Sequence, residues 1–191
     1  MKDLEKILRQ RLSRVEPETT RLNNKIAASV LIPIGLRQET AQHEILLTKR
    51  SHKVETHKGQ ISFPGGLFEV GDRDLLETAL RETREEVGIE KTHIEVLGAL
   101  DPVQTLRDVM IYPWVAKVVF PQKLIFNSDE VEKPLFLSIE RLLVEGLKPV
   151  QVSVKENGLA FKVASIGITC EKELIWGASA KILGQLLAIL N

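Results

Sequence analysis

The stretch Arg-Glu-Thr-Arg-Glu-Glu-Val-Gly at residues 81–88 determines how the rest of this chain is interpreted. An α-helix turns by roughly 100° per residue, so Glu82, Glu85 and Glu86 would project within an arc of about 100°. Carboxylates that close repel one another, whereas hard divalent cations prefer carboxylate oxygens as ligands. The pattern therefore has two interpretations: a solvated, charged helix face or a platform for a metal ion.

Signals on both sides of this stretch support a helix and favour the metal platform. Asp74 is a typical N-cap residue, Glu77 completes a capping-box pattern, and Gly88 is typical of a helix C-terminus. Upstream, Gly65 and Gly66 form a turn in which a backbone without side chains can approach a ligand closely. A glycine-rich turn that leads into an acidic helix is more specific than either feature alone.

The composition limits the class of protein. A chain of 191 residues, 43% hydrophobic and 27% charged, fits one globular domain. Lys+Arg and Asp+Glu both number 26, so no bulk charge attracts nucleic acid or an acidic membrane. The single Cys170 excludes an intramolecular disulfide, and we expect a buried thiol. The sequence has neither a signal peptide nor an apolar run of about 20 residues, so we expect a cytoplasmic protein.

Hydrophobic periodicity predicts the remaining elements. Besides the acidic helix, we expect helices at 2–14 and 178–190, and strands at 25–36, 43–50, 93–100, 110–120, 135–139, 150–154 and 159–166. The first two strands read as a hairpin, and Asn157-Gly158 is a strong turn signal between the last two. Strands mixed with three helices predict a single layered α/β domain with a mixed sheet.

Residues 66–88 resemble the Nudix box, the sequence motif of the Nudix hydrolases. The second half of the motif matches at Arg81, Glu82, Thr83, Glu85, Glu86, Gly88 and Ile89. Thr83 stands where an apolar residue is usual, the first half is one residue longer than the general pattern, and Asp72 stands where a glutamate is usual. The resemblance implies a Nudix-type α/β/α sandwich, with an N-terminal helix at 1–20 that belongs to the same domain as the hydrolase domain at 21–191.

Flanking segments narrow this resemblance to the coenzyme A pyrophosphatase-like branch, which also carries the extra residue. The segments are Leu46-Leu47-Thr48-Lys49-Arg50-Ser51, Gly59 to Gly66, and Ile175-Trp176-Gly177-Ala178-Ser179-Ala180. One position departs from the branch: Glu55 stands where an arginine is usual. A cation there would suit the 3′-phosphate of coenzyme A, so Glu55 leaves the preferred substrate open.

The resemblance implies a pyrophosphohydrolase that depends on Mg²⁺ or Mn²⁺. It would cleave the diphosphate of coenzyme A or a CoA-like nucleotide into adenosine 3′,5′-bisphosphate and phosphopantetheine. It implies metal ligation by Glu82, Glu85 and Glu86, catalytic roles for Glu82 and Glu85, and a positioning role for Arg81. Glu130 is our candidate for a further acid that activates water; the alternative is an exposed loop acid.

The resemblance also implies a substrate-binding surface before the acidic helix. The candidates are Arg50, Ser51, Lys58, Gly65 and Gly66. A solvated basic loop is the alternative for the residues around Lys58, and a core aromatic rather than a base-stacking residue is the better interpretation of Trp176. The partner would be a small nucleotide, and the oligomeric state stays open between a monomer and a homodimer.

Three rival interpretations remain at this stage, of which the last is an unrelated structural domain whose acidic helix is a coincidence. In the first interpretation, the chain is a Nudix hydrolase for ADP-ribose, a dinucleoside polyphosphate or an oxidised nucleotide. In the second it would be a Nudix-like module that senses a nucleotide without cleaving it. Such modules often lack an acid of the box, whereas Glu82, Glu85 and Glu86 are all present here.

Overall fold

The structure is a computed structural model that describes residues 2–12, 26–54, 57–105, 108–120, 124–156 and 159–191. Its helices are α1 (Lys2–Arg11), α2 (Leu75–Val87), a 3-10 turn (Lys91–His93), α3 (Ile139–Glu145) and α4 (Gly177–Leu190). Its strands are β1 (Ile26–Arg37), β2 (Gln42–Arg50), β3 (Ile61–Ser62), β4 (Gly65–Leu67), β5 (Ile94–Ala99), β6 (Val103–Gln104), β7 (Val109–Val118), β8 (Val131–Ser138), β9 (Lys148–Glu156), β10 (Leu159–Cys170) and β11 (Glu173–Trp176).

A mixed sheet of eight strands forms the centre of the molecule. Its main order is β3-β2-β1-β7-β5, with β4 paired to β1, β6 to β7 and β8 to β2. β1 and β7 run parallel, and the other pairs are antiparallel. The predicted hairpin of the first two strands is confirmed, because β1 and β2 pair up to the partners Arg37 and Gln42.

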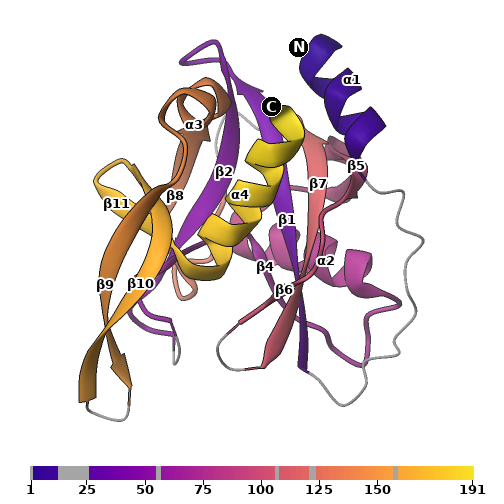
Figure 1. Ribbon diagram of the computed structural model, residues 1–191. Helices are drawn as coiled ribbons and strands as arrows, with labels where there is room; N and C mark the ends of the chain where they lie inside the picture. The colour runs from indigo at the N-terminus through magenta and orange to yellow at the C-terminus, as the bar shows by residue number, and fades with distance from the viewer. Residues whose placement is uncertain (1, 13–25, 55–56, 106–107, 121–123, 157–158) are drawn as a thin grey trace.

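Helices cover both faces of this sheet (Figure 1), as the predicted α/β/α sandwich requires. α2 lies on one face, where its apolar side chains share a core with alternate residues of the central strands, including Leu31, Leu46 and Trp114. α1 and α4 lie on the other face, over a larger core that includes Ile32 and Val115. Because successive strand residues point to opposite faces, the continuous apolar run of β1 supplies both cores.

A second sheet, in the order β11-β10-β9, lies beside the first and its hairpin projects from the body of the molecule (Figure 1). β9 and β10 pair in antiparallel register up to Glu156 and Leu159, which confirms the predicted hairpin. The predicted turn residues 157–158 lie outside the described part of the chain. β10 continues into the core, where Cys170 is buried as predicted. Burial raises the pKa of its thiol to about 11.

The N-terminal helix packs into the same core as α4. Leu8 and Leu12 are buried in the cluster that also contains Leu183. α1 ends at Arg11, earlier than the predicted residue 14. The predicted limit at residues 20–21 lies outside the described residues, so it stays a prediction.

The expectation of three helices was wrong, because the described chain has a fourth, α3. The predicted strand at 135–139 is β8, which runs from Val131 to Ser138, and the chain then turns into the helix. The Ser138 hydroxyl accepts a hydrogen bond from the Arg141 backbone N–H, and Gly146 ends the helix. Apolar residues continue from the strand through Ile139 and Leu142, so the change from strand to helix spacing was not evident in the sequence.

We predict that Leu183→Ala lowers the free energy of unfolding by about 2–5 kcal/mol, because this fully buried side chain of α4 fills the core opposite α2. Urea denaturation followed by circular dichroism measures the change. Lys181→Ala, on the exposed side of the same helix, is the control and should shift stability by less than about 0.5 kcal/mol. Equal effects of the two variants would contradict the placement of α4.

Candidate metal and diphosphate site

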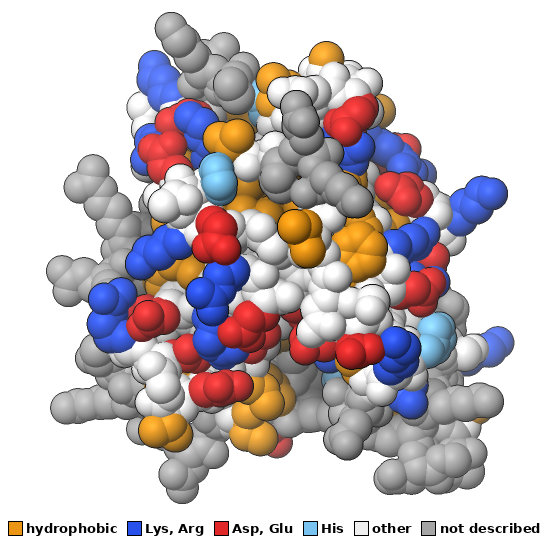
Figure 2. Space-filling model, turned by 180° about the vertical axis from the view of Figure 1, so that it is seen from behind, with side chains coloured by type: hydrophobic (Ala, Val, Ile, Leu, Met, Phe, Trp, Pro, Cys, Tyr) orange, Lys and Arg blue, Asp and Glu red, His pale blue; other side chains and the backbone are white. Residues whose placement is uncertain are grey.

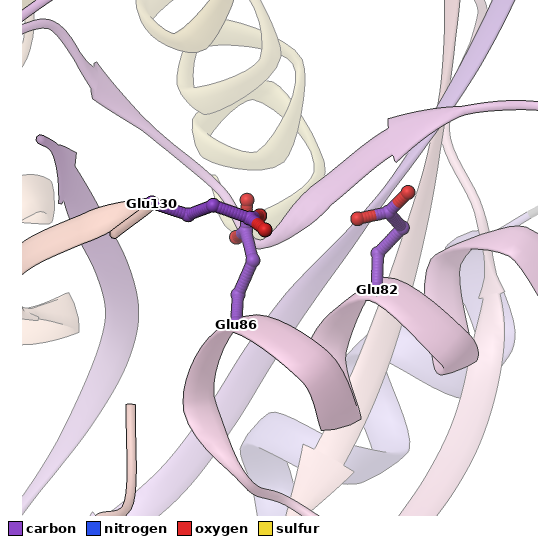
Figure 3. Close-up of side chains that lie close together, drawn as sticks. All are labelled: Glu82, Glu86 and Glu130. Atoms are coloured by element: carbon purple, nitrogen blue, oxygen red, sulfur yellow. The ribbon is translucent and has the colours of Figure 1, made fainter. Parts of the chain in front are cut away.

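Three carboxylates from two parts of the chain meet at one place. Glu82 and Glu86 extend from successive turns of α2, and Glu130 reaches them from the residue before β8 (Figure 3). One carboxylate oxygen of each lies within 4.8 Å of the others. The site lies on the face that carries α2, where Figure 2 shows acidic side chains gathered among basic ones.

Burial sets the electrostatics of this cluster. Glu86 is only 2% exposed, and desolvation raises the pKa of its carboxyl to about 8, although the positive charge of Arg50 acts in the opposite direction. Burial also raises the pKa of Glu82, against the lowering effect of Arg81. Glu82 and Glu130 each add to the raised pKa of Glu86 because like charges repel.

The residues present fit a divalent cation. Glu86 Oε2 is buried and has no hydrogen-bond partner among the described residues, although a buried carboxylate oxygen without a partner is costly. An ion with oxygen ligands would satisfy that atom and turn the mutual repulsion of the three carboxylates into attraction. The donor set, carboxylates alone, suits a hard cation such as Mg²⁺ or Mn²⁺ better than a thiolate-binding metal.

Local sequence signals fix the helix that carries two of the acids. The Asp74 side chain accepts a hydrogen bond from the Glu77 backbone N–H at 2.8 Å, which confirms the predicted N-cap. The Glu77 carboxylate in turn accepts from the Arg73 backbone N–H. Gly88 ends the helix in the left-handed conformation, with φ of 70°. Thr83 is buried on the helix, and its hydroxyl satisfies itself by donating to the Ala79 carbonyl at 2.7 Å.

The two glycines of β4 let α2 approach the sheet. A Cβ atom at Gly65 would collide with the backbone of Ser29 and Val30 in the neighbouring strand. A Cβ atom at Gly66 would collide with the carboxylate of Glu82. The first glycine therefore serves the packing of strands, and the second leaves room for a side chain of the site. Both were predicted to bind substrate, and that role stays a prediction.

Arg81 is held by a buried partner. Its Nε and Nη2 donate to the two carboxylate oxygens of Asp72 at 2.9 and 3.1 Å, and its Nη1 donates to Glu82 and Glu85 at 3.0 and 3.1 Å. Asp72 also accepts from the Thr78 hydroxyl, and the Arg81 guanidinium lowers the pKa of Asp72 to about 2. This geometry suits the predicted positioning role of Arg81.

A short loop brings the third acid to the helix. The Asn127 backbone N–H donates to the Glu86 carbonyl at 3.1 Å, and the Asn127 side chain donates to the Glu130 carboxylate at 3.0 Å. A Cβ atom at Gly88 would collide with Ile125 of the same loop. The loop is thus anchored on the C-terminal end of α2, and Glu130 is neither a free nor a fully exposed acid.

The predicted metal ligand Glu85 does not join this cluster. Its side chain is exposed and pairs with Arg81 and Arg84. Glu82 and Glu86 are four residues apart and share the side of the helix that meets Glu130, whereas Glu85 lies nearer the solvent. Its predicted role as a ligand remains a prediction.

The predicted substrate-binding residues of the basic segment occupy different positions. Arg50 Nη1 lies 3.8 Å from Glu86 Oε1, so this side chain reaches the cluster. Ser51 is buried; its backbone N–H donates to the Glu130 carbonyl, and its hydroxyl accepts from the Lys53 N–H. Lys58 is exposed. Glu55 lies outside the described residues.

Sequence reasoning missed two contributors to the site. It noted Asp72 only as a departure from the motif, whereas the structure makes it the buried partner of Arg81. It gave no role to Asn127, because an asparagine is typical of loops but does not indicate which groups its backbone and side chain contact. A cavity of about 520 Å³ lies elsewhere, lined by residues such as Leu36, His43 and Phe120 at the opposite end of β2, and none of the three acids lines it.

The molecule is thus an α/β/α sandwich in which two acids of one helix meet a third acid from the loop before β8. Residues 26–157 match the NUDIX domain, and the chain belongs to the Nudix family of diphosphate-hydrolysing enzymes. These enzymes generally use divalent metal ions.

Individual relatives agree with this assignment. An uncharacterized Nudix hydrolase, NudL, from Yersinia enterocolitica is 34% identical over 188 residues, 97% of this chain and 91% of that protein. The mitochondrial coenzyme A diphosphatase NUDT8 of Mus musculus is 40% identical over 139 residues, 71% of this chain and 64% of that protein. A MutT/nudix family protein from Enterococcus faecalis has the same fold, with a TM-score of 0.53 at 16% identity, over 100% of this chain and 79% of that one. Among the described residues, no helix has the length and apolar character needed to cross a bilayer.

We predict that Gly66→Ala lowers the rate of diphosphate hydrolysis by at least about tenfold while the fold is retained. The new methyl group would displace the Glu82 carboxylate, whose flexible side chain can move without unfolding the strand. Gly71→Ala is the matched control, because nothing lies within 4 Å of a Cβ atom there. Circular dichroism and turnover measure the two effects, and wild-type turnover in a folded Gly66→Ala variant would contradict the predicted contact.

We also predict that the metal-free protein loses stability as the pH rises. The pKa of Glu86 is about 8 in the folded state and near 4.5 when unfolded, so between these values only the folded state keeps the proton. The free energy of unfolding therefore falls between about pH 4.5 and pH 8, by on the order of a few kcal/mol, and levels off above. Urea unfolding with a chelator should show this slope in the wild type and a flatter one in Glu86→Gln. Equal slopes would refute the assignment.

Proposed function

We propose that this protein hydrolyses the diphosphate of coenzyme A or a CoA-like nucleotide with the help of Mg²⁺ or Mn²⁺. The products from coenzyme A would be adenosine 3′,5′-bisphosphate and phosphopantetheine. The observation that carries the proposal is the meeting of Glu82, Glu86 and Glu130 around an unpaired, buried carboxylate oxygen. The coenzyme A substrate is supported by the similarity to the mouse mitochondrial coenzyme A diphosphatase and by the flanking segments of the box.

The reaction adds water across a phosphoric anhydride bond. Water attacks one phosphorus atom, the bond from that phosphorus to the bridging oxygen breaks, and each product leaves as a phosphate monoester. A divalent ion supplies charge neutralisation at the diphosphate and acidifies water. Glu82 and Glu86 would hold it together with Glu130, and an ionised carboxylate among these is placed to accept the proton that the attacking water loses.

The chain's own cations divide the remaining work. Arg81 is bound on several sides by Asp72, Glu82 and Glu85, so it would orient the carboxylates rather than bind the substrate. Arg50 has fewer bonds and reaches the cluster from β2, so it would bind a phosphate oxygen of the substrate. Lys58, exposed in the segment after β2, would bind a more distant charge of the nucleotide.

The rival substrates would be cleaved by the same metal-assisted hydrolysis of a diphosphate. Glu55 replaces the arginine usual in the coenzyme A branch, which would disfavour the 3′-phosphate and favour the dephospho form. ADP-ribose, a dinucleoside polyphosphate or an oxidised nucleotide would use the same carboxylates. A nucleotide sensor without turnover is less well supported, because all three acids of the box are present and two of them meet Glu130.

A substrate panel with Mg²⁺ or Mn²⁺ tests the proposal. We expect turnover of coenzyme A, of its dephospho form at least as well if Glu55 repels the 3′-phosphate, and none in a chelator. Glu86→Gln should lower turnover at least about 100-fold, since the ion supplies several kcal/mol of charge stabilisation. Glu145→Gln, in the exposed ion pair of α3 with Arg141, is the matched control.

The outcomes separate the rivals. If ADP-ribose or another nucleotide is turned over faster than either form of coenzyme A, the proposed substrate is wrong and the proposed chemistry stands. Nucleotide binding without metal-dependent turnover would favour the sensor. Near wild-type turnover in a folded Glu86→Gln variant would remove Glu86 from the site.

A further inference from the structure

Arg50, the last residue of β2, is bound to the acid cluster differently from Arg81. Its Nη1 lies 3.8 Å from Glu86 Oε1, beyond hydrogen-bond distance, so charge attraction alone joins the two groups. Its Nε is buried and has no hydrogen-bond partner among the described residues. Arg81, in contrast, donates hydrogen bonds to Asp72, Glu82 and Glu85. The Arg50 guanidinium therefore has N–H donors that are not used in hydrogen bonds to the described residues, whereas most of those of Arg81 are used.

The backbone of Arg50 is hydrogen-bonded on both sides, whereas its guanidinium has only the ion pair with Glu86 among the described residues. The Arg50 N–H donates to the Gln60 carbonyl at 2.9 Å, and its carbonyl accepts from the Gly59 N–H at 3.0 Å. The side chain is 27% exposed, so its charged end borders solvent beside Glu86. An arginine anchored at the backbone and weakly paired at its tip can change partners at small cost.

The Arg50 guanidinium and a metal ion cannot both lie close to Glu86 without repelling each other. At separations of a few ångströms this repulsion is considerable even in a partly solvated site. A diphosphate brings negative oxygens that hydrogen-bond well to a guanidinium, and the unpaired Nε and the Nη groups offer the donors for such a contact. The same group that hinders the ion before the substrate arrives would therefore bind the substrate afterwards.

We propose that Arg50 is an exchangeable counter-ion: in the substrate-free protein it occupies the place beside Glu86 that a metal ion would take, and it moves to the diphosphate on binding, which opens the carboxylate to the metal ion. This inference rests on the proposed function, since it requires a divalent ion at Glu86. It makes the affinities for the ion and the diphosphate mutually dependent, because each ligand strengthens the other by the same factor. The free ion then binds weakly, and substrate and ion bind together.

Calorimetric titration of Mg²⁺ into the substrate-free protein tests this. It is run at pH 8.5 and at pH 9.5, because the removal of Arg50 would also raise the pKa of Glu86, which is about 8 in the folded protein. We expect Arg50→Gln to bind Mg²⁺ at least about threefold more tightly than the wild type, since one nearby positive charge is removed. Arg84→Gln removes the same charge from the exposed side of α2 and should stay within about twofold. Arg50→Lys keeps the charge and should keep the weak affinity. Arg50→Met is a second neutral variant if Arg50→Gln does not fold.

The same titration with methylenediphosphonate, a diphosphate that cannot be hydrolysed, tests the exchange. Its own affinity for Mg²⁺ is measured separately and subtracted. We expect the diphosphonate to tighten Mg²⁺ binding in the wild type, and this factor to shrink at least threefold in Arg50→Gln but not in Arg84→Gln. Unchanged or weaker Mg²⁺ binding in a folded neutral variant would overturn the exchange and leave the metal site standing. Absence of Mg²⁺ binding in the wild type and in the neutral variants, with and without the diphosphonate, would overturn the metal site and the exchange together.

Discussion

The site depends on how closely α2 lies against the pair of strands β1 and β4. The glycines of β4 make this approach possible: Gly65 lies against the backbone of β1, and Gly66 lies against the Glu82 carboxylate. One turn further along the helix, Glu86 is buried as a result. A carboxylate in such surroundings is unfavourable in its charged form, so the protein holds a group that gains most when a cation arrives. The buried carboxylate thus reduces stability locally at the proposed site, as is common at functional sites.

Two further devices fix the geometry around that helix. Asp72 clamps Arg81 from the side of the preceding loop, and Arg81 in turn holds Glu82. Asn127 fastens the loop of Glu130 to the last turn of the helix through the Glu86 carbonyl. The positions of all three acids therefore depend on α2, although Glu130 lies more than forty residues after the other two.

Much of this could be predicted from the sequence, because local signals specify the helix at both ends. Asp74 and Gly88 set the limits of α2, and alternating or continuous apolar runs predicted the sheet and its layers. Helical spacing could not decide which acids meet, since it gives directions around an axis but not the orientation of that axis on the sheet. The four-residue pair Glu82 and Glu86 faces Glu130, and Glu85 faces solvent. Contacts across the chain, such as those of Asp72 and Asn127, depend on folding and carry little local signal.

The elements that cover the sheet on the side opposite α2 limit where the chain can be cut or fused without loss of the fold. The match to the NUDIX domain ends at residue 157, yet Ile168, Ile175 and Leu186 complete the larger core from β10, β11 and α4. A recombination or fusion joined at that position would part the sheet from its cover and expose a broad apolar surface to water, where it would promote aggregation. The unit that folds is therefore larger than the stretch that matches the NUDIX domain.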